Sequence, residues 1–236
     1  MQVHQDSLWG WALALAVSVV FAAVLFSATD RSYAELGDTN SVVAILQDGE
    51  VVGTGVAFGG NLIATAAHVV SDVYGGGAVG DFAFIRSDED NRLRVGRVMF
   101  YDKVVDLAVI RLLDADGLVT SPLACEAPEI GQRVIVRGYP LYLGLVTSEG
   151  HYVRLDGPGR PPLTIFPPAT VLWPHFYLID AAATFGNSGG PVYDEYGRVT
   201  GLVVGLVRDP LRSITGLIVV LPGTEICKAL DIPAFA

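Results

Sequence analysis

The sequence predicts an all-β protein, a barrel or a sandwich, on two observations. After Glu35 the chain consists of short runs rich in Val, Ile, Thr and aromatic residues. Glycine, proline and acidic residues interrupt these runs about every ten residues, as turns do between strands. Even spacing of short strands is typical of β-barrels and sandwiches.

The predicted strands form two groups. The first covers 41–46, 51–58, 61–65, 82–87, 92–100 and 106–112, and the second covers 132–138, 145–155, 175–180, 198–207 and 213–221. The segment from Leu118 to Gly131 has prolines and no clear periodicity, so it is the predicted connector. Thr224 is predicted to cap a short helix at about 224–231. The aromatic and proline cluster at 166–177 either lines a cleft or packs a barrel end, and packing is the favoured interpretation.

Composition bounds the function classes. About half of the residues are apolar (51%) and 17% are charged, which is enough for a substantial core. The chain has 15 basic and 25 acidic residues, a formal charge of −10, and no basic run. Nucleic acid is therefore not an expected partner. Two cysteines, Cys125 and Cys227, are too few for a disulfide framework or a zinc site; two buried thiols are favoured over one bridge.

The amino terminus is predicted to be a membrane segment. Residues 8–28 carry no charged side chain, and Trp9 and Trp11 stand where interfacial aromatic residues would. A buried helix is disfavoured because the segment has no polar face. Residues 1–34 are thus an uncleaved anchor or, second, a signal cleaved before Glu35. We expect residues 35–236 to be tethered to a membrane or secreted, on the extracytoplasmic side.

The string Gly186-Asn187-Ser188-Gly189-Gly190-Pro191 contains the strongest candidate nucleophile. A serine hydroxyl needs a base to take its proton, and the oxyanion formed at the attacked carbonyl needs N–H donors. Gly186 can adopt a backbone conformation that side chains forbid, so its N–H group and that of Ser188 are predicted to aim at one point. A glycine-rich turn is the alternative, but the six-residue string is more specific than a shorter G-x-S-x-G.

Two further motifs supply a base and an acid. His68 follows the predicted strand 61–65 in the string TAAHVV, and imidazole is the usual proton shuttle for acyl transfer. Asp106 opens the strand DLAVI, where its carboxylate can accept the imidazole N–H. Asp102 is rejected as this acid because it lies on the turn before the strand. The remaining histidines, His4, His151 and His175, have no comparable context and are predicted to be surface or strand residues.

These strings resemble the trypsin/chymotrypsin superfamily, and within it the HtrA/Deg-like branch without a PDZ domain. The resemblance runs from about Ser41 to Leu230 and includes Gly53-Thr54-Gly55, Gly138-Tyr139-Pro140, Asp180-Ala181-Ala182, Gly201-Leu202-Val203-Val204-Gly205 and the terminal helix. It implies a chymotrypsin-like double β-barrel, with barrels at about 35–118 and 131–222. It also implies that His68 and Asp106 come from the first barrel, Ser188 from the second, and that substrate lies between them.

The sequence departs from the family at several points. No Ile-Val-Gly-Gly start is present, and Asn187 replaces the acid that pairs with a newly cut amino terminus in zymogen-type relatives. Activation by N-terminal cleavage is therefore not expected. The cysteines that flank the histidine in digestive relatives are missing. Val204 stands where a Ser or Thr usually offers its hydroxyl to the catalytic acid, which predicts one hydrogen bond fewer.

The resemblance also locates the primary specificity pocket. Ala182 stands where tryptic enzymes have Asp, so the pocket has no negative charge to pair with a Lys or Arg side chain. Residues 203–206 include no histidine, which argues against selection of Glu or Gln. We expect a broad preference for small or medium apolar side chains. The predicted pocket residues are Ala182, Ala183, Thr184, Val204, Gly205 and Leu206.

The leading hypothesis is a serine endopeptidase that acts on proteins or peptides through an acyl-enzyme, without metal or cofactor. The membrane is a second expected partner, through residues 8–28, and a homo-oligomer is compatible with the HtrA resemblance. One alternative is a weak or inactive protease-fold protein that binds peptides without cutting them, since fold does not dictate function. An esterase that uses the same three residues is a third.

Overall fold

The computed structural model describes residues 41–74, 82–88, 90–156, 165–166, 176–208, 211 and 213–231. The chain divides into two units, Met1–Glu35 and Leu36–Ala236, and all the described residues belong to the second. The predicted membrane segment at 8–28, His4 and His175 lie outside the described residues. Within the described ranges, no helix is long and apolar enough to cross a membrane.

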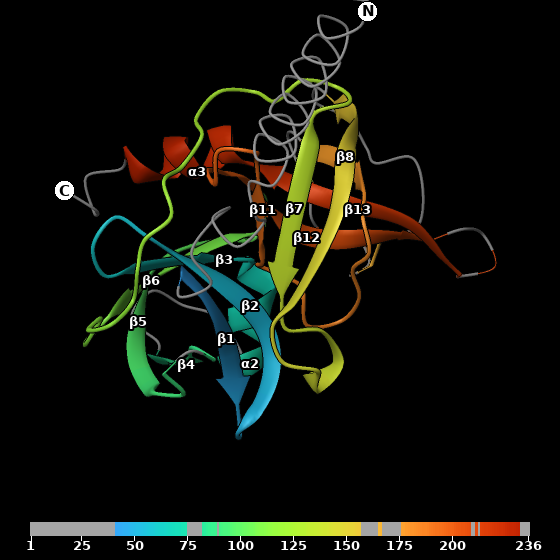
Figure 1. The fold of residues 1–236 in the computed structure, drawn as a ribbon. Helices are drawn as coiled ribbons and strands as arrows, with labels where there is room; N and C mark the ends of the chain where they lie inside the picture. Colours follow the sequence, from blue (N-terminus) through green and yellow to red (C-terminus); the bar gives the residue numbers. More distant parts are fainter. Residues whose placement is uncertain are drawn as a thin grey trace, which may run out of the picture. The chain divides into compact units, whose positions relative to one another are not determined.

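The first group of predicted strands forms a closed antiparallel barrel (Figure 1). Its strand order is β1-β2-β3-β6-β5-β4, and β4 pairs back to β1. Apolar and β-branched residues suit these half-buried, pleated positions. The strands are β1 (Val42–Gln47), β2 (Glu50–Phe58), β3 (Leu62–Thr65), β4 (Phe82–Arg86), β5 (Leu93–Asp102) and β6 (Leu107–Leu112).

The second group forms a sheet in the order β11-β7-β8-β10-β13-β12-β9. Because β11 also pairs with β12, six of these strands close into a ring, and β9 lies outside it on β12. The all-β class is therefore confirmed. The strands are β7 (Arg133–Gly138), β8 (Val146–Asp156), β9 (Ile165–Phe166), β10 (Phe176–Asp180), β11 (Pro191–Tyr193), β12 (Val199–Arg208) and β13 (Ile214–Pro222), with a 3-10 turn η3 (Pro140–Tyr142) after β7.

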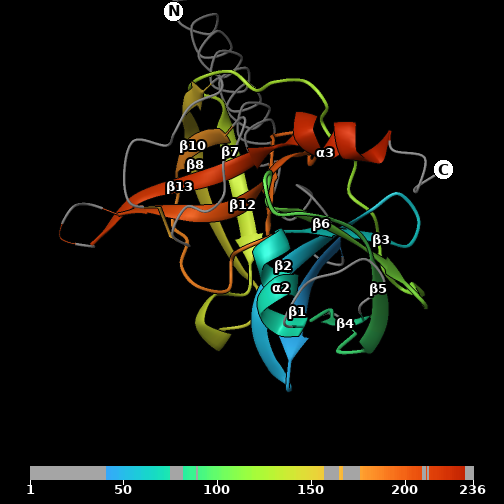
Figure 2. The same cartoon turned by 180° about the vertical axis from the view of Figure 1, so that it is seen from behind.

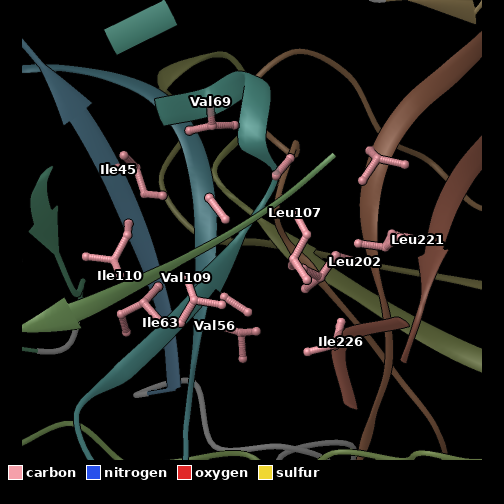
Figure 3. Close-up of a cluster of buried hydrophobic side chains, with 14 of the residues drawn as sticks. Ile45, Val56, Ile63, Val69, Leu107, Val109, Ile110, Leu202, Leu221 and Ile226 are labelled. Carbon is pink, nitrogen blue, oxygen red and sulfur yellow. The ribbon is translucent and has the colours of Figure 1, made fainter. Parts of the chain in front are cut away.

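Of the two buried apolar clusters among the described residues, one includes side chains from both barrels. Figure 3 shows Val69 and Leu107 of the first barrel, and Leu202, Leu221 and Ile226 of the second half, among its members. All five side chains are buried. Burial of apolar area is the main favourable term in folding, so this shared core holds the two barrels as one body.

In the part of the chain that the structure describes, two short α-helices accompany the barrels, and Figure 2 shows both from behind. Helix α2 (Ala67–Tyr74) follows β3 and contacts β6, β1 and β2. The sequence did not predict it. Helix α3 (Gly223–Leu230) confirms the predicted terminal helix, but it begins one residue earlier and Thr224 does not cap it.

Cys125 and Cys227 form a disulfide bond, so the prediction of two buried thiols is wrong. Cys125 is exposed, and α3 is held against the connector, where a side chain on Gly223 would clash with the Ala124 carbonyl. This packing brings the two cysteine Cα atoms to 5.7 Å, inside the range that a disulfide requires. The bond joins residues 102 apart in sequence, so it closes a very long loop.

Replacing both cysteines with alanine is expected to lower the free energy of unfolding by about 2–5 kcal/mol, because the bond restricts the unfolded chain. Urea unfolding of the parent and the double variant measures the loss. A reductant should destabilise the parent and leave the double variant unchanged. Equal stability of the two proteins would contradict the expectation.

Candidate active site

Asp106 binds His68 through both oxygens of its carboxylate. The His68 Nδ1 atom lies 2.8 Å from Asp106 Oδ2, and the His68 backbone N–H donates to Oδ1 at 2.9 Å. Asp106 is 1% exposed, whereas the His68 side chain is 20% exposed. The acid is therefore enclosed behind the imidazole, and the ring remains within reach of solvent or substrate.

The local backbone explains this placement. Asp106 immediately precedes β6 and has a positive φ of 62°, a conformation that Asp and Asn tolerate better than most residues. Its backbone carbonyl accepts a hydrogen bond from the Ala67 N–H at 3.2 Å, at the first residue of α2. The turn before β6 and the start of α2 are thus tied together by main chain and side chain at once.

The Ser188 turn of the second barrel inserts against the first. Gly189 N–H donates to the Val203 carbonyl at 2.7 Å, and Val203 N–H donates to the Gly190 carbonyl at 2.8 Å, which fixes the turn on β12. Gly189 has a φ of +80°, and a side chain there would clash with the Thr54 carbonyl. Only glycine allows the turn to approach the first barrel this closely.

Gly53 on β2 lies beside both Val69 and the serine turn. A Cβ on Gly53 would clash with Val69, the residue after His68, and would lie 3.2 Å from the Ser188 carbonyl. Among the described residues, no hydrogen bond joins the Ser188 hydroxyl to the imidazole. Such bonds are often long in ligand-free proteins and shorten when substrate binds.

Two backbone N–H groups of the serine turn, those of Gly186 and Ser188, are available to bind an oxyanion. The N–H groups of Asn187, Gly189 and Gly190 all donate to backbone carbonyls. Those of Gly186 and Ser188 have no acceptor among the described residues. Preorganised N–H groups of this kind can hold an oxyanion.

The Phe185–Gly186 peptide is held in one orientation. Its carbonyl accepts a hydrogen bond from Leu141 N–H at 3.0 Å, and because the peptide is planar and trans, the Gly186 N–H points the opposite way. Gly186 has a φ of +98°, and any side chain there would clash with the Tyr139 carbonyl. Glycine is therefore required at this position.

The comparisons with known proteins agree with this geometry. A family model described as a trypsin-like peptidase domain matches residues 53–202, more than half of the chain.

The chain belongs to the trypsin-like peptidase family.

Its relatives include named serine proteases, which confirms the HtrA-type resemblance. Serine endoprotease DegS of Escherichia coli K12 is 29% identical over 141 residues, which cover 59% of this chain and 35% of DegS. Serine protease Rv3671c of Mycobacterium tuberculosis H37Rv is 30% identical over 166 residues, 68% of this chain and 38% of that protein. The chain therefore spans little more than a third of the length of these relatives.

Solved structures share the chymotrypsin-like double barrel. The inactive form of Rv3671c protease matches with a TM-score of 0.64 and 23% identity, covering 81% of this chain and 88% of that one. The HtrA-type protease AlgW with a decapeptide gives a TM-score of 0.61 and 21% identity, covering 76% and 51%. At these identities the likeness establishes the fold.

Thr54 is a site residue that the motif reading missed. Its buried hydroxyl donates to the Gly186 carbonyl at 2.6 Å and accepts from Tyr139 N–H at 3.0 Å. The string Gly53-Thr54-Gly55 was noted as part of the family resemblance, but its partners lie far along the chain. Gly138 completes the contact, because a side chain there would press on Thr54 and Asn187. Thr54 thus links β2 both to the serine turn, at the Gly186 carbonyl, and to the segment after β7, at the Tyr139 N–H.

Thr54→Val is expected to lower kcat about tenfold to a hundredfold, since the isosteric change leaves the Gly186 carbonyl and the Tyr139 N–H without their partner. Thr54→Ser keeps the hydroxyl and is the matched control, expected within about threefold of the parent. Initial rates on one peptide ester and thermal unfolding of both variants separate positioning from stability. A kcat unchanged in Thr54→Val would exclude the positioning role.

The predicted pocket residues lie on two segments of the chain. Ala182, Ala183 and Thr184 form the approach to the serine turn, and Ala182 is exposed while the other two are half-buried. Val204 and Leu206 on β12 are buried. No charged side chain occurs among the six predicted residues. Because valine has no polar side-chain atom, Val204 cannot donate a hydrogen bond to Asp106.

Three other predicted features also have a defined place. Asp102 caps its own turn, where Oδ1 accepts from Val104 N–H at 2.7 Å, and it has no hydrogen bond to His68. His151 lies on β8, exposed, with Nδ1 3.5 Å from Asp180 Oδ1. The buried Asn187 side chain has an Oδ1 atom without a hydrogen-bond partner among the described residues. Within those residues, no group of three metal-binding side chains occurs.

Proposed function

We propose that this chain is a serine endopeptidase that hydrolyses peptide bonds through an acyl-enzyme. The observation that carries the proposal is the Asp106–His68 pair beside a serine turn whose two amides, Gly186 and Ser188, are free to donate. Ser188 attacks the carbonyl carbon and His68 takes its proton. Asp106 keeps the imidazole in the tautomer that can accept it, and the two amides hold the oxyanion.

Breakdown of the intermediate uses the same groups. His68 returns the proton to the leaving amine and then takes a proton from water, whose oxygen attacks the acyl carbon. His68 gives this proton to the Ser188 oxygen as the bond to the acyl carbon breaks, which releases the acid product and restores the serine. The uncharged lining at Ala182, Ala183, Thr184, Val204, Gly205 and Leu206 supports a preference for Val, Ala or Leu at the residue before the scissile bond. Apolar pockets distinguish neighbouring aliphatic side chains by only ~1–3 kcal/mol, so the preference is broad.

Labelling with a fluorophosphonate, read by intact mass, tests the proposal directly. The parent is expected to gain one adduct, and Ser188→Ala and His68→Ala none. His151→Ala is the matched control, because His151 is exposed on β8 and the substitution keeps its backbone N–H, which donates to Asp180 Oδ1 on β10. A folded parent without an adduct would refute the proposed function.

The Cys125–Cys227 disulfide is evidence about the cellular compartment in which the protein resides. Disulfides persist in oxidising compartments and are rare where thiols are kept reduced. The bond therefore supports the proposal that the catalytic part is exported, either anchored or secreted. Trapping free thiols at the moment of cell lysis tests this, and two reactive thiols in the native protein would argue against export.

A further inference from the structure

Strand β12 offers one edge to the Ser188 turn. Its other edge pairs with β13, so β11, the serine turn and β9 all lie on the same edge. Along it, β11 pairs as far as Leu202, and Val203 bonds to Gly189 and Gly190. Strand β9 then pairs at Leu206 and Val207.

Only Val204 and Gly205 lie between the serine turn and β9. Among the described residues, no strand pairs with these two on that edge. At about 3.3 Å per residue, the open stretch accommodates roughly two residues of an extended peptide. Peptides commonly bind proteins by adding a strand to an open edge of this kind.

The direction of β9 matches that of such a peptide. β9 is antiparallel to β12, with Phe166 opposite Leu206 and Ile165 opposite Val207, so it runs toward the serine turn. A peptide that pairs antiparallel with β12 and presents its scissile bond to Ser188 runs the same way. The third and fourth residues of this peptide before the scissile bond would have to pair with Leu206 and Val207, the part of the β12 edge that β9 already occupies.

We propose that β9 closes the substrate cleft after two residues, so that this protein selects substrates by the two residues before the scissile bond and gains nothing from a longer extended segment. The inference rests on the proposed function, since it concerns the same cleft. The chain that precedes those two residues must turn away from β12. Segments that are bent or flexible there are therefore the substrates of choice.

The test compares two capped peptide p-nitroanilides that share their last two residues, one of two residues and one of four. For the full chain, kcat/KM should agree within about twofold. The variant Ile165→Pro/Phe166→Pro removes both N–H groups of β9, and the longer peptide should then gain about tenfold from the backbone bonds it can form. Ile165→Ala/Phe166→Ala keeps the N–H groups and should behave as the parent.

A parent that already prefers the longer peptide tenfold would overturn the inference, and that comparison stands even if the proline variant does not fold. A folded proline variant with no gain would overturn it as well. If the parent gives no fluorophosphonate adduct, the proposed function fails separately. The cleft is then judged by binding of the two capped peptides to the parent, where equal affinity supports the inference and tighter binding of the longer one refutes it.

Discussion

Replacing Ser188 with alanine is expected to lower kcat by about a millionfold, the loss seen when the nucleophile of a catalytic triad is removed. The imidazole and the two amides remain, so a residual rate above that in water should persist. Turnover of the best peptide p-nitroanilide by parent and variant gives the ratio. Enzyme at high concentration is needed to read so small a rate.

The same substitution should leave the fold intact. The Ser188 hydroxyl has no hydrogen bond among the described residues, so its loss should change the free energy of unfolding by no more than about 0.5 kcal/mol. Urea unfolding provides this control. Activity within a thousandfold of the parent would mean that another group is the nucleophile.

Replacing Asp106 with asparagine is expected to lower kcat at neutral pH by about ten thousandfold. Asparagine accepts the positive φ of 62° and preserves the turn before β6. Its amide N–H₂ donates to His68 Nδ1, which leaves the proton on Nε2, and that nitrogen can no longer accept the proton of Ser188. A pH–rate profile should show activity recovering as hydroxide replaces the histidine as base.

Asp102→Asn is the matched control for this experiment. Asp102 also precedes β6, but its Oδ1 accepts from the N–H groups of Val104 and Val105, and asparagine retains that oxygen. Its kcat should stay within about twofold of the parent. Comparable losses in the two variants would show that the turn, and not the carboxylate beside His68, is what matters.

Local patterns predicted the all-β class because the longer strands each carry their own signal, whereas the double barrel was implied by the family resemblance. Runs such as 42–47 and 107–112 are short, apolar, β-branched and bounded by turns, and they are strands β1 and β6. Helix α2 carried no such signal, because AHVVSDVY has no acidic residue in its first turn and no basic residue in its last. The shortest strands, β9 and β11, are too brief for a period of two to be read.

Contacts between distant parts of the chain account for the remaining differences. The triad strings could be recognised one by one, since each is a short chemical motif. The hydroxyl of Thr54 meets the Gly186 carbonyl across 132 residues, and Cys125 meets Cys227 across 102. The sequence around each of these residues contains no pattern that indicates which distant residue it contacts. Packing of the barrels decides both contacts.

The division of the site between the barrels has a consequence for biosynthesis. During synthesis the first barrel, with His68 and Asp106, leaves the ribosome before Ser188 is made. The Gly186 carbonyl and the Tyr139 N–H after β7 are held only when both meet Thr54 of β2, which requires both barrels to be folded and docked. The newly made chain, with its unfolded segments exposed, therefore lacks the assembled site that the proposed peptidase activity requires. That site forms only in the final packing step, which also removes those segments from attack.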